Sequence, residues 1–333
     1  MPVKLVDVIR ASTVECSHRG DMVVVNSGGE VLYKLGDPEH LTFLRSASKP
    51  LQAIAALELG IAQEYNLDLK DIALILSSHS GEKQHIEALK GLMKKIGVDE
   101  DALRCGVHEP LNKDAASELA ASGRLPSKLH CNCSGKHLGQ IAASKLKGMP
   151  VESYYKPEHG IQADIQKVIS DFSGFPVENI IKGIDGCGVP VYGVPLKNMA
   201  LAYANLCDAK FMDGKYNKSQ NYVIGAMTMY PEMVGGTGRF DTELMKNFGD
   251  RVIGKFGDEG VYCVGLPGKA VGLALKIEDG NGRAVGPAIL ETLLQMEVIR
   301  KDEIERMKTF WNTETLNHKG EKVGEIRAVF KIR

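Results

Sequence analysis

The sequence predicts a mixed α/β (α+β) fold in which both chain ends build one antiparallel sheet around an inserted helical lobe. Strand-like runs of β-branched residues lie near both termini, the first beside a turn signal at 26–29. Between them, apolar residues recur at helical spacing and are separated by Gly and Pro. This order favours a single domain over residues 1–333, with its sheet built from roughly 1–40 and 250–333.

The individual elements follow from these local patterns. β-Branched residues cluster or alternate in the predicted strands, which span 3–9, 22–26, 30–34, 261–266, 271–278 and 323–332. Apolar residues recur every three or four positions in the predicted helices, which span 48–60, 82–96, 112–121, 136–146, 162–173 and 196–207. A short apolar run at 71–76 is strand-like, and the turn signal at 279–282 predicts a hairpin.

The composition restricts the classes of partner. The chain is 44% hydrophobic and 25% charged, as expected for a globular protein, and its net charge is −1. No basic surface is therefore expected for nucleic acid or anionic lipid, which leaves a small-molecule substrate. The sequence has neither a long apolar span nor a signal-peptide cleavage site, so no membrane association and a cytoplasmic location are expected. Seven cysteines, an odd number, suit a reducing compartment.

The first chemical feature is a serine and a lysine three residues apart, Ser46 and Lys49, at the predicted start of a helix. This spacing places a hydroxyl and an amine on one helix face. A neutral lysine within hydrogen-bond reach can take the serine proton and create an acylating nucleophile. The apolar run after Lys49 offers a buried setting, which favours the neutral amine. The pattern predicts a serine amidohydrolase, although a solvated lysine in a first helical turn would look the same.

The second feature is the turn 77–82, Ser-Ser-His-Ser-Gly-Glu, which follows the apolar run at 71–76. For Ser80 the pattern favours helix capping. Ser78 precedes the cap and can pair with a second lysine, for which Lys255 is the candidate. Lys-x-Gly ahead of an antiparallel strand is similar to the Lys-Thr-Gly element of penicillin-recognising serine enzymes.

The third feature is a pair of glycine-bearing turns, 130–137 and 185–190, that together hold three cysteines. Two thiolates and a nitrogen ligand suit zinc, but the spacing is not that of a zinc finger, so ordinary buried cysteines are the alternative. Cys133 is also a candidate nucleophile, because a helix start beside Lys136 and His137 favours its thiolate. Three turns therefore compete for the nucleophile.

Taken together, five ordered motifs resemble the rhizobial-type L-asparaginases, the asparaginase II type. They span residues 45–52, 78–82, 132–137, 185–190 and 236–241. The likeness extends from about residue 15 to residue 280. The fold of that family is similar to the fold of serine β-lactamases and glutaminases, so the resemblance implies the same architecture here.

The resemblance also implies an activity, the hydrolysis of L-asparagine to L-aspartate and ammonia through an acyl-enzyme. Ser46 would be the nucleophile and Lys49 its base. Ser78 and Lys255 would transfer a proton to the leaving ammonia and later activate water. The opposite assignment, in which Ser78 attacks, stays open at this point.

The resemblance also implies which residues bind the substrate and which bind a metal ion. A zwitterionic substrate needs one acidic and one basic partner, and the candidates within the motifs are Arg45, His137 and Asp185. The family carries zinc held by two cysteines and a lysine, which by motif would be Cys133, Lys136 and Cys187. The ion is expected to support the site rather than to generate a hydroxide nucleophile. A homodimer is expected from general frequency.

Three other functions fit parts of the pattern. A glutaminase or other small-amide amidohydrolase would use the same groups, because one methylene separates the two amides. A penicillin-binding protein would need a Ser-Asp-Asn triplet, which is missing. A zinc-dependent binding module would use only the cysteine turns, and Ser46→Ala would leave its activity unchanged.

Overall fold

The computed structural model describes residues 1–332 and divides into two compact units. Unit 1 comprises Met1–Ala47, Val194–Asp208 and Asp250–Arg333, and unit 2 comprises Ser48–Gly193 and Ala209–Gly249. Unit 1 holds a sheet drawn from both chain ends, and unit 2, inserted within it along the sequence, is mainly helical. The predicted mixed fold class is thereby confirmed, whereas the single domain stays a prediction.

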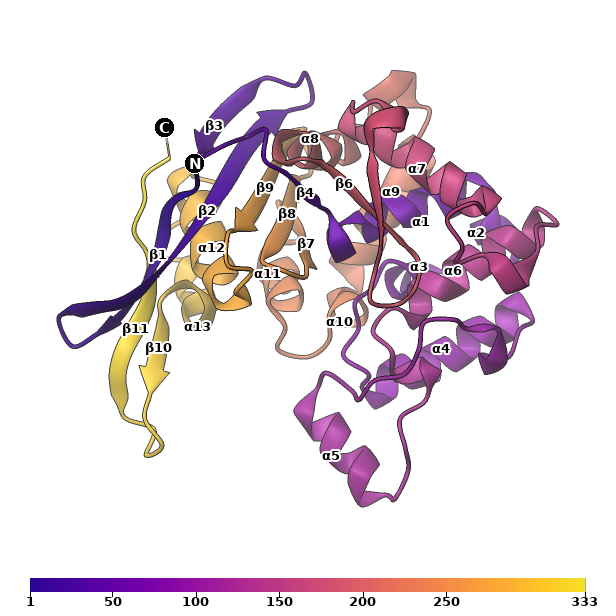
Figure 1. Cartoon of the computed structure of the whole chain (residues 1–333), viewed down its shortest axis with the longest axis horizontal. Coiled ribbons are helices and arrows are strands. Elements are labelled where there is room, and N and C mark those ends of the chain that lie inside the picture. The colour runs from indigo at the N-terminus through magenta and orange to yellow at the C-terminus, as the bar shows by residue number, and fades with distance from the viewer. Residues whose placement is uncertain (333) are drawn as a thin grey trace. The chain divides into compact units, whose positions relative to one another are not determined.

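The sheet of unit 1 is antiparallel and joins the two ends of the chain. Its strands are β1 (Val3–Arg10), β2 (Thr13–Asn26), β3 (Val31–Leu35), β7 (Ile253–Gly257), β8 (Val261–Leu266), β9 (Val271–Ile277), β10 (Thr313–Leu316) and β11 (Lys322–Ala328). Their order is β10-β11-β1-β2-β9-β8-β7, and β3 pairs with β2. Val6 of β1 lies opposite Ala328 of β11, so the first and last strands lie side by side (Figure 1). A short strand, β4 (Leu41–Phe43), lies near the end of the first segment of unit 1, which ends at Ala47.

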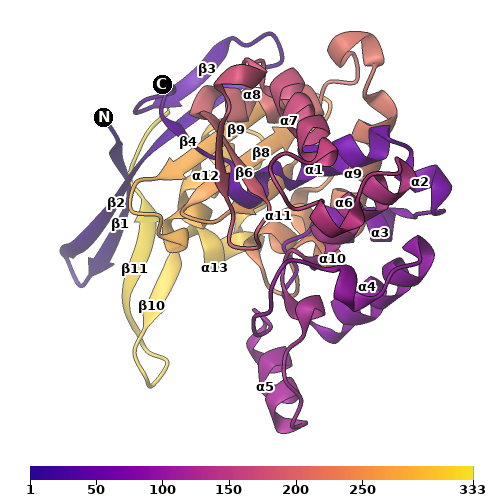
Figure 2. The same cartoon turned by 45° about the vertical axis from the view of Figure 1, so that its right-hand side comes forward.

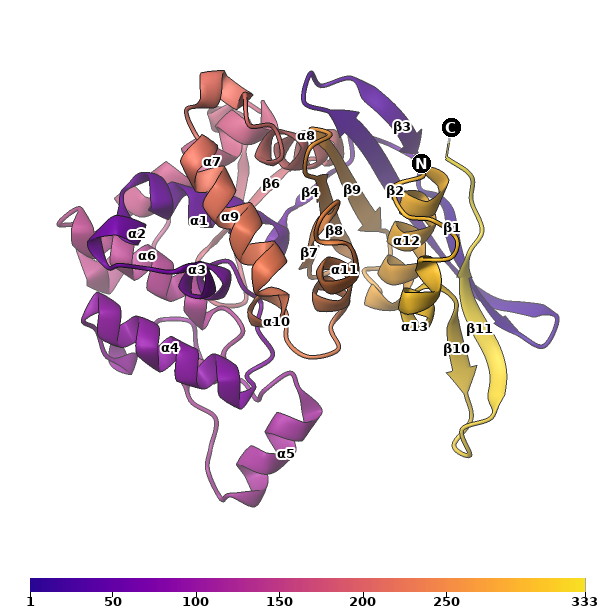
Figure 3. The same ribbon diagram turned by 180° about the vertical axis from the view of Figure 1, so that it is seen from behind.

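Helices cover both faces of this sheet. On one face α8 (Leu196–Leu206) approaches β9 so closely that a Cβ on Gly272 would lie 1.9 Å from the Ala200 carbonyl oxygen. Gly272 pairs with Val25 of β2, and Met22, three residues earlier, points to the opposite face. Met22 Sδ accepts a hydrogen bond from Thr292 of α12 (Val285–Gln295), so α12 covers that second face (Figure 3). The short helix α13 (Lys308–Trp311) follows.

Unit 2 consists mainly of helices. They are α1 (Lys49–Glu58), α2 (Ile61–Glu64), α3 (Leu69–Ile75), α4 (Lys83–Ile96), α5 (Lys113–Ala121), α6 (Ser134–Leu146), α7 (Gly160–Ser173), α9 (Asn217–Met229), α10 (Pro231–Val234) and α11 (Phe240–Phe248). The strands β5 (Ile181–Ile184) and β6 (Pro190–Pro195) form an antiparallel hairpin. Helix α5 projects from the other helices of its unit (Figure 2). The six predicted helices are all present, as α1, α4, α5, α6, α7 and α8.

Several local predictions were wrong. The strand-like run at 71–76 is the helix α3, because Asp68 and Asp71 form a capping box that starts a helix there. The turn at 279–282 leads into the helix α12 rather than into a hairpin strand. Lys255 was placed ahead of a strand, whereas it lies inside β7. Within residues 1–332, no helix has the length and apolar character needed to cross a membrane.

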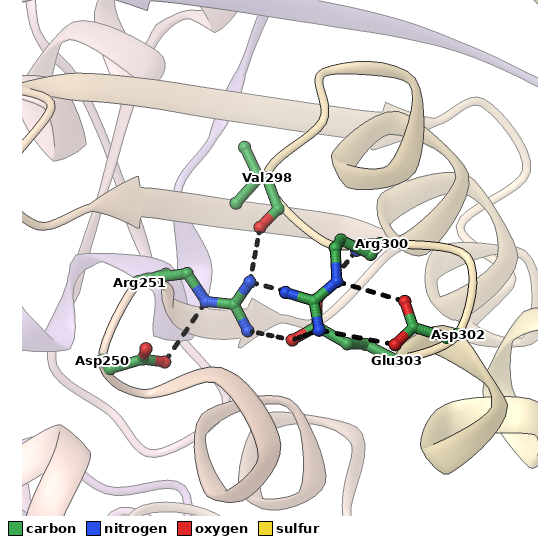
Figure 4. Close-up of polar contacts among 6 residues, drawn as sticks. All are labelled: Asp250, Arg251, Val298, Arg300, Asp302 and Glu303. Atoms are coloured by element: carbon green, nitrogen blue, oxygen red, sulfur yellow. Dashed lines mark hydrogen bonds and ion pairs between the residues drawn. The ribbon is translucent and has the colours of Figure 1, made fainter.

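A network of ion pairs in unit 1 joins the segment before β7 to the segment after α12 (Figure 4). Arg251 donates to both carboxylate oxygens of Glu303, at 3.1 and 2.9 Å, and to the Val298 carbonyl oxygen. The backbone N–H of Arg300 also donates to Glu303. The Arg251 guanidinium, followed by this N–H, lowers the pKa of Glu303 to about 2. The network therefore links stability to the ionisation of one carboxylate.

We expect Glu303→Gln to lower the Tm of the protein at pH 7 by a few degrees. The pKa of glutamate in an unfolded chain is about 4.3, so the folded pKa near 2 is depressed. A depressed carboxylate contributes stability above the unfolded pKa and loses it as pH falls through the folded pKa. The Tm difference between wild type and variant should therefore shrink between about pH 4.5 and pH 2 in calorimetry. Glu305→Gln, an exposed neighbour, is the control, and a pH-independent difference would contradict the linkage.

Candidate active site

A buried lysine and a serine of unit 2 are in direct contact. Lys49, the first residue of α1, is 1% exposed, and its Nζ lies 2.9 Å from Ser78 Oγ. The same amine donates to the Ser77 carbonyl oxygen at 2.6 Å. Ser78 follows α3, and its backbone N–H donates to the Val234 carbonyl oxygen at 2.9 Å. The amine and the hydroxyl are thus held at a distance that permits proton transfer.

The helices of unit 2 create this contact through close packing. Helix α1 is buried along almost its whole length, so Lys49 starts a helix that has apolar neighbours on all sides. Helix α6 packs on α3, because two glycines leave room for the approach. A Cβ on Gly135 would lie 2.0 Å from the Leu74 carbonyl oxygen, and one on Gly139 would lie 2.5 Å from Ile75 Cγ2. This packing brings the start of α6 beside the turn that carries Ser78.

His79, next to Ser78, ties that turn to α6. The backbone N–H of Gly81 donates to His79 Nδ1, and His79 Nε2 lies 2.8 Å from Ser134 Oγ. Nδ1 is therefore the acceptor and Nε2 carries the hydrogen. Burial, and then the nearby His85 and Lys49, lower the pKa of His79 well below its ordinary value. A neutral His79 thus holds the turn in place.

The predicted capping role of Ser80 was wrong. The residue that caps α4 is Glu82, which forms a capping box with His85. Ser80 Oγ instead donates to the Gly235 carbonyl oxygen at 2.8 Å. The backbone there is tight, since a Cβ on Gly236, whose φ is +116°, would lie 2.3 Å from Ser80 Oγ.

The three predicted metal ligands lie together in unit 2. Lys136 Nζ donates to Cys187 Sγ at 2.9 Å, and both side chains are buried. Hydrogen bonds with Cys131 and Cys187 lower the pKa of the Cys133 thiol well below its ordinary value. Burial opposes the charge on Lys136, but Cys133 and Cys187 outweigh it and raise the pKa of that amine. Two sulfurs and an amine therefore lie close together in the interior of this unit.

Of the predicted substrate ligands in unit 2, His137 is fully buried and Asp185 is half-buried. His137 Nδ1 lies 2.6 Å from the hydroxyl of Tyr154, whereas no hydrogen-bond partner for His137 Nε2 lies within residues 1–332. Burial lowers the pKa of His137 well below its ordinary value. Asp185 starts the turn between β5 and β6, and its carboxylate accepts from the Gly186 N–H. Its negative charge is one of the causes that raise the pKa of the Lys136 amine.

In unit 1, Ser46 lies beside the face of β7 that carries Lys255. The segment that contains Ser46 packs on Gly257, where a Cβ would lie 2.7 Å from the Leu44 carbonyl oxygen and 3.4 Å from the Ala47 nitrogen. Gly257 and Lys255 are two residues apart on β7, so they share this face. Ser46 is 7% exposed and Lys255 is fully buried. Both residues belong to unit 1.

The third substrate candidate, Arg45, also lies in unit 1. Its φ of +50° is left-handed, which is uncommon for a residue with a Cβ. Its guanidinium lies 3.2 Å from Asp258 Oδ2 and 4.0 Å from Glu259 Oε1. The Arg45 side chain therefore lies beside the turn after β7. Strained backbone conformations of this kind often occur at functional sites.

Comparison with known protein families identifies the chain. The sequence profile of the family described as L-asparaginase II matches residues 6–328, which is nearly the whole length. The chain belongs to the L-asparaginase II family. The predicted relationship to this family is confirmed. Among curated proteins, none matches this sequence.

Solved structures similar to this L-asparaginase II family member have low sequence identity to it. A crystal structure of Mglu in its native form in 4.3 M NaCl is 15% identical, and the match covers 86% of this chain and 63% of Mglu with a TM-score of 0.42. A crystal structure of a β-lactamase from Mycobacterium bovis is 13% identical, with coverage of 84% of this chain and 95% of that chain and a TM-score of 0.45. This chain thus spans less than two thirds of Mglu.

The structure of this family member also contains site residues that the sequence analysis missed. The hydrogen bond from the Lys49 amine to Ser78 was not predicted, because Lys49 was considered as the base of Ser46. His79 lies inside a quoted motif, and its place beside Ser78 was the available signal. Tyr154 lies in no motif, and no pattern indicated its contact with His137.

Proposed function

We propose that this member of the L-asparaginase II family hydrolyses L-asparagine to L-aspartate and ammonia through a serine acyl-enzyme. The observation that carries the proposal is the 2.9 Å contact between the buried amine of Lys49 and the hydroxyl of Ser78. An alcohol becomes an effective nucleophile or proton carrier when a base lies within hydrogen-bond reach. The same amine donates to the Ser77 carbonyl oxygen, which holds it beside the Ser78 hydroxyl.

In the proposed reaction, Ser46 Oγ attacks the side-chain amide carbon of asparagine while its proton passes to Lys49 Nζ. The tetrahedral intermediate then collapses and the C–N bond breaks. The proton moves from Lys49 through Ser78 Oγ to the leaving nitrogen, and ammonia departs. Water attacks the resulting ester by the reverse relay, which regenerates Ser46 and releases aspartate. Lys255 assists the proton transfers at Ser78.

Two of the three substrate candidates have charges opposite to those of the α-carboxylate and α-ammonium groups of asparagine. We propose that Arg45 binds the α-carboxylate and Asp185 the α-ammonium group, because opposite charges form the strongest hydrogen bonds. We propose that His137, whose buried Nε2 has no hydrogen-bond partner within residues 1–332, binds a further polar atom of the substrate. Arg45 already lies near Asp258 and Glu259, so substrate must compete with them for its guanidinium.

We propose that zinc binds at Cys133, Lys136 and Cys187. Two sulfurs and an amine in mutual contact form a donor set that suits a soft divalent ion, and zinc would replace the proton on Lys136. Within the described residues, no three His, Cys, Asp or Glu side chains are grouped to hold a metal. The proposed third ligand is a lysine. The ion would supply positive charge and hold the two turns together, in a supporting role.

Ammonia release from purified protein tests the proposed function. We expect kcat/KM for L-asparagine to exceed that for L-glutamine by about 10-fold or more, because a pocket discriminates one methylene by about 10 to 200-fold. Zinc content and activity after chelation are measured in the same preparation, and partial activity of the metal-free protein is expected. A preference for glutamine would favour the alternative, a glutaminase, and the absence of ammonia from both amides would refute an asparaginase.

A further inference from the structure

His137 Nε2 is a polar atom that the protein leaves without a partner in its interior. The side chain is fully buried, and within residues 1–332 nothing accepts from or donates to this nitrogen. Buried polar groups are almost always hydrogen-bonded, so an unpaired one in a folded protein requires an explanation. Explaining this one depends on which of the two ring nitrogens carries the hydrogen.

The directions of two hydrogen bonds determine the tautomer. The backbone nitrogen of Arg104 lies 2.9 Å from the Tyr154 hydroxyl oxygen, and a backbone N–H can only donate. The Tyr154 oxygen therefore accepts from Arg104. Within residues 1–332 the acceptor for its own hydrogen is His137 Nδ1, 2.6 Å away, so the hydroxyl donates to that nitrogen. Nδ1 is then the acceptor, and the hydrogen of the neutral imidazole is on Nε2.

We infer that Tyr154 is a positioning residue that fixes His137 as an Nε2–H donor, and that this N–H binds an oxygen of the substrate. The inference rests on the proposed function and extends it. A donor can pair with a carboxylate or amide oxygen but not with an ammonium group. The geometry thus assigns His137 to an oxygen atom of asparagine and leaves the α-ammonium to another residue.

The surroundings of Tyr154 make it suited to this role. The tyrosine is fully buried, and its ring meets the His137 ring edge-on, with centroids 5.4 Å apart at 86°. Gln162 Nε2 donates to the Tyr154 carbonyl oxygen at 2.7 Å, so the backbone is held as well. Tyr154 acts through His137, because its hydroxyl is occupied by Arg104 and His137.

The direct test is NMR of the protein with ¹⁵N-labelled histidine. In wild type we expect the His137 signals of an Nε2–H tautomer, and we expect the Nε2–H resonance to shift when L-aspartate, the proposed product, is added. Tyr154→Phe should yield a mixture of tautomers and a loss of about 10-fold in kcat/KM, mainly through KM. Tyr216→Phe is the matched control, since it removes another buried hydroxyl of unit 2, one that donates to Asp171.

A double-variant cycle separates positioning from general structural damage. A glutamine side chain can place an amide N–H near the position of Nε2 and has no tautomers. We therefore expect His137→Gln to keep more activity than His137→Asn, and Tyr154→Phe to cost little further activity in the His137→Gln background. An equal cost in both backgrounds would overturn the positioning role.

The readouts also distinguish this inference from the proposed function. An Nδ1–H tautomer in wild type, or an Nε2–H signal unchanged by saturating aspartate, would overturn the inference even if the protein is an asparaginase. A fixed Nε2–H tautomer that responds to aspartate in a protein without asparaginase activity would support the inference and refute the proposed reaction. The wild-type spectra decide the tautomer even if Tyr154→Phe does not fold.

Discussion

Lys49→Met is expected to reduce kcat/KM for asparagine by about 10³-fold or more while the protein stays folded. The Lys49 amine contacts Ser78 Oγ, and no proton can be exchanged there after the substitution. Loss of a positioned base costs about 10² to 10⁴-fold. Methionine has a similar length and fills the buried space, and it removes a polar group that must be satisfied inside the protein. The Tm should therefore stay near the wild-type value.

The control for this variant is Lys145→Met. Lys145 Nζ also donates to two backbone carbonyl oxygens, those of Ile96 and Gly97, but it lies on the exposed side of α6. We expect its removal to leave the kinetics of ammonia release unchanged. If Lys49→Met retained more than about a tenth of the wild-type kcat/KM, the amine would not be the base that the reaction requires.

The fold could be predicted where the sequence pattern reflects burial on one side. Apolar residues of α4 recur on one face and Gly97 ends the helix with a φ of +71°, so its pattern and its boundary agree. The run at 71–76 failed as a prediction because buried helices and buried strands are both continuously apolar. The structure decides the case through a capping box formed by Asp68 and Asp71.

The candidate site could be predicted only in part, because motifs are local and contacts are not. Ser-x-x-Lys indicated Ser46 and Lys49, and Ser78 was selected from a turn. The contact between Lys49 and Ser78 depends on the packing of α1 and α3, and 29 positions separate the two residues in the chain. Tyr154 was beyond prediction for the same reason, since its partners Arg104 and His137 come from two other segments.

The cysteine and lysine cluster shows how a resemblance can supply what chemistry alone would not. A lysine donates a lone pair only when it is neutral, which makes it an unusual metal ligand. The structure places Lys136 Nζ 2.9 Å from Cys187 Sγ, and the neighbouring Cys133 and Cys187 raise the pKa of this amine. A metal ion and a proton would compete for this amine, so zinc affinity should rise with pH.

Ser46→Ala is expected to abolish the acyl-enzyme and to lower kcat by about 10³-fold or more. The measurement is intact-protein mass spectrometry after rapid acid quench of the protein with asparagine, in which wild type should gain one aspartyl group. Ser78→Ala should still gain that group but turn over slowly, because the relay to the leaving nitrogen is lost. Ser144→Ala is the control, since the hydroxyl of this buried serine donates to the Gln140 carbonyl oxygen of its own helix.

The distinction between the two serines follows from the contact of Ser78 and from the position of Ser46 in the chain. Ser78 Oγ is joined to Lys49 Nζ, as befits a proton carrier between a base and a leaving group. Ser46 lies in the turn that runs directly into α1, so the N-terminus of a ten-residue helix follows it. The positive end of a helix stabilises an oxyanion that forms nearby. An aspartyl adduct on Ser78 in the Ser46→Ala variant would reverse the assignment and make Lys49 the base of Ser78.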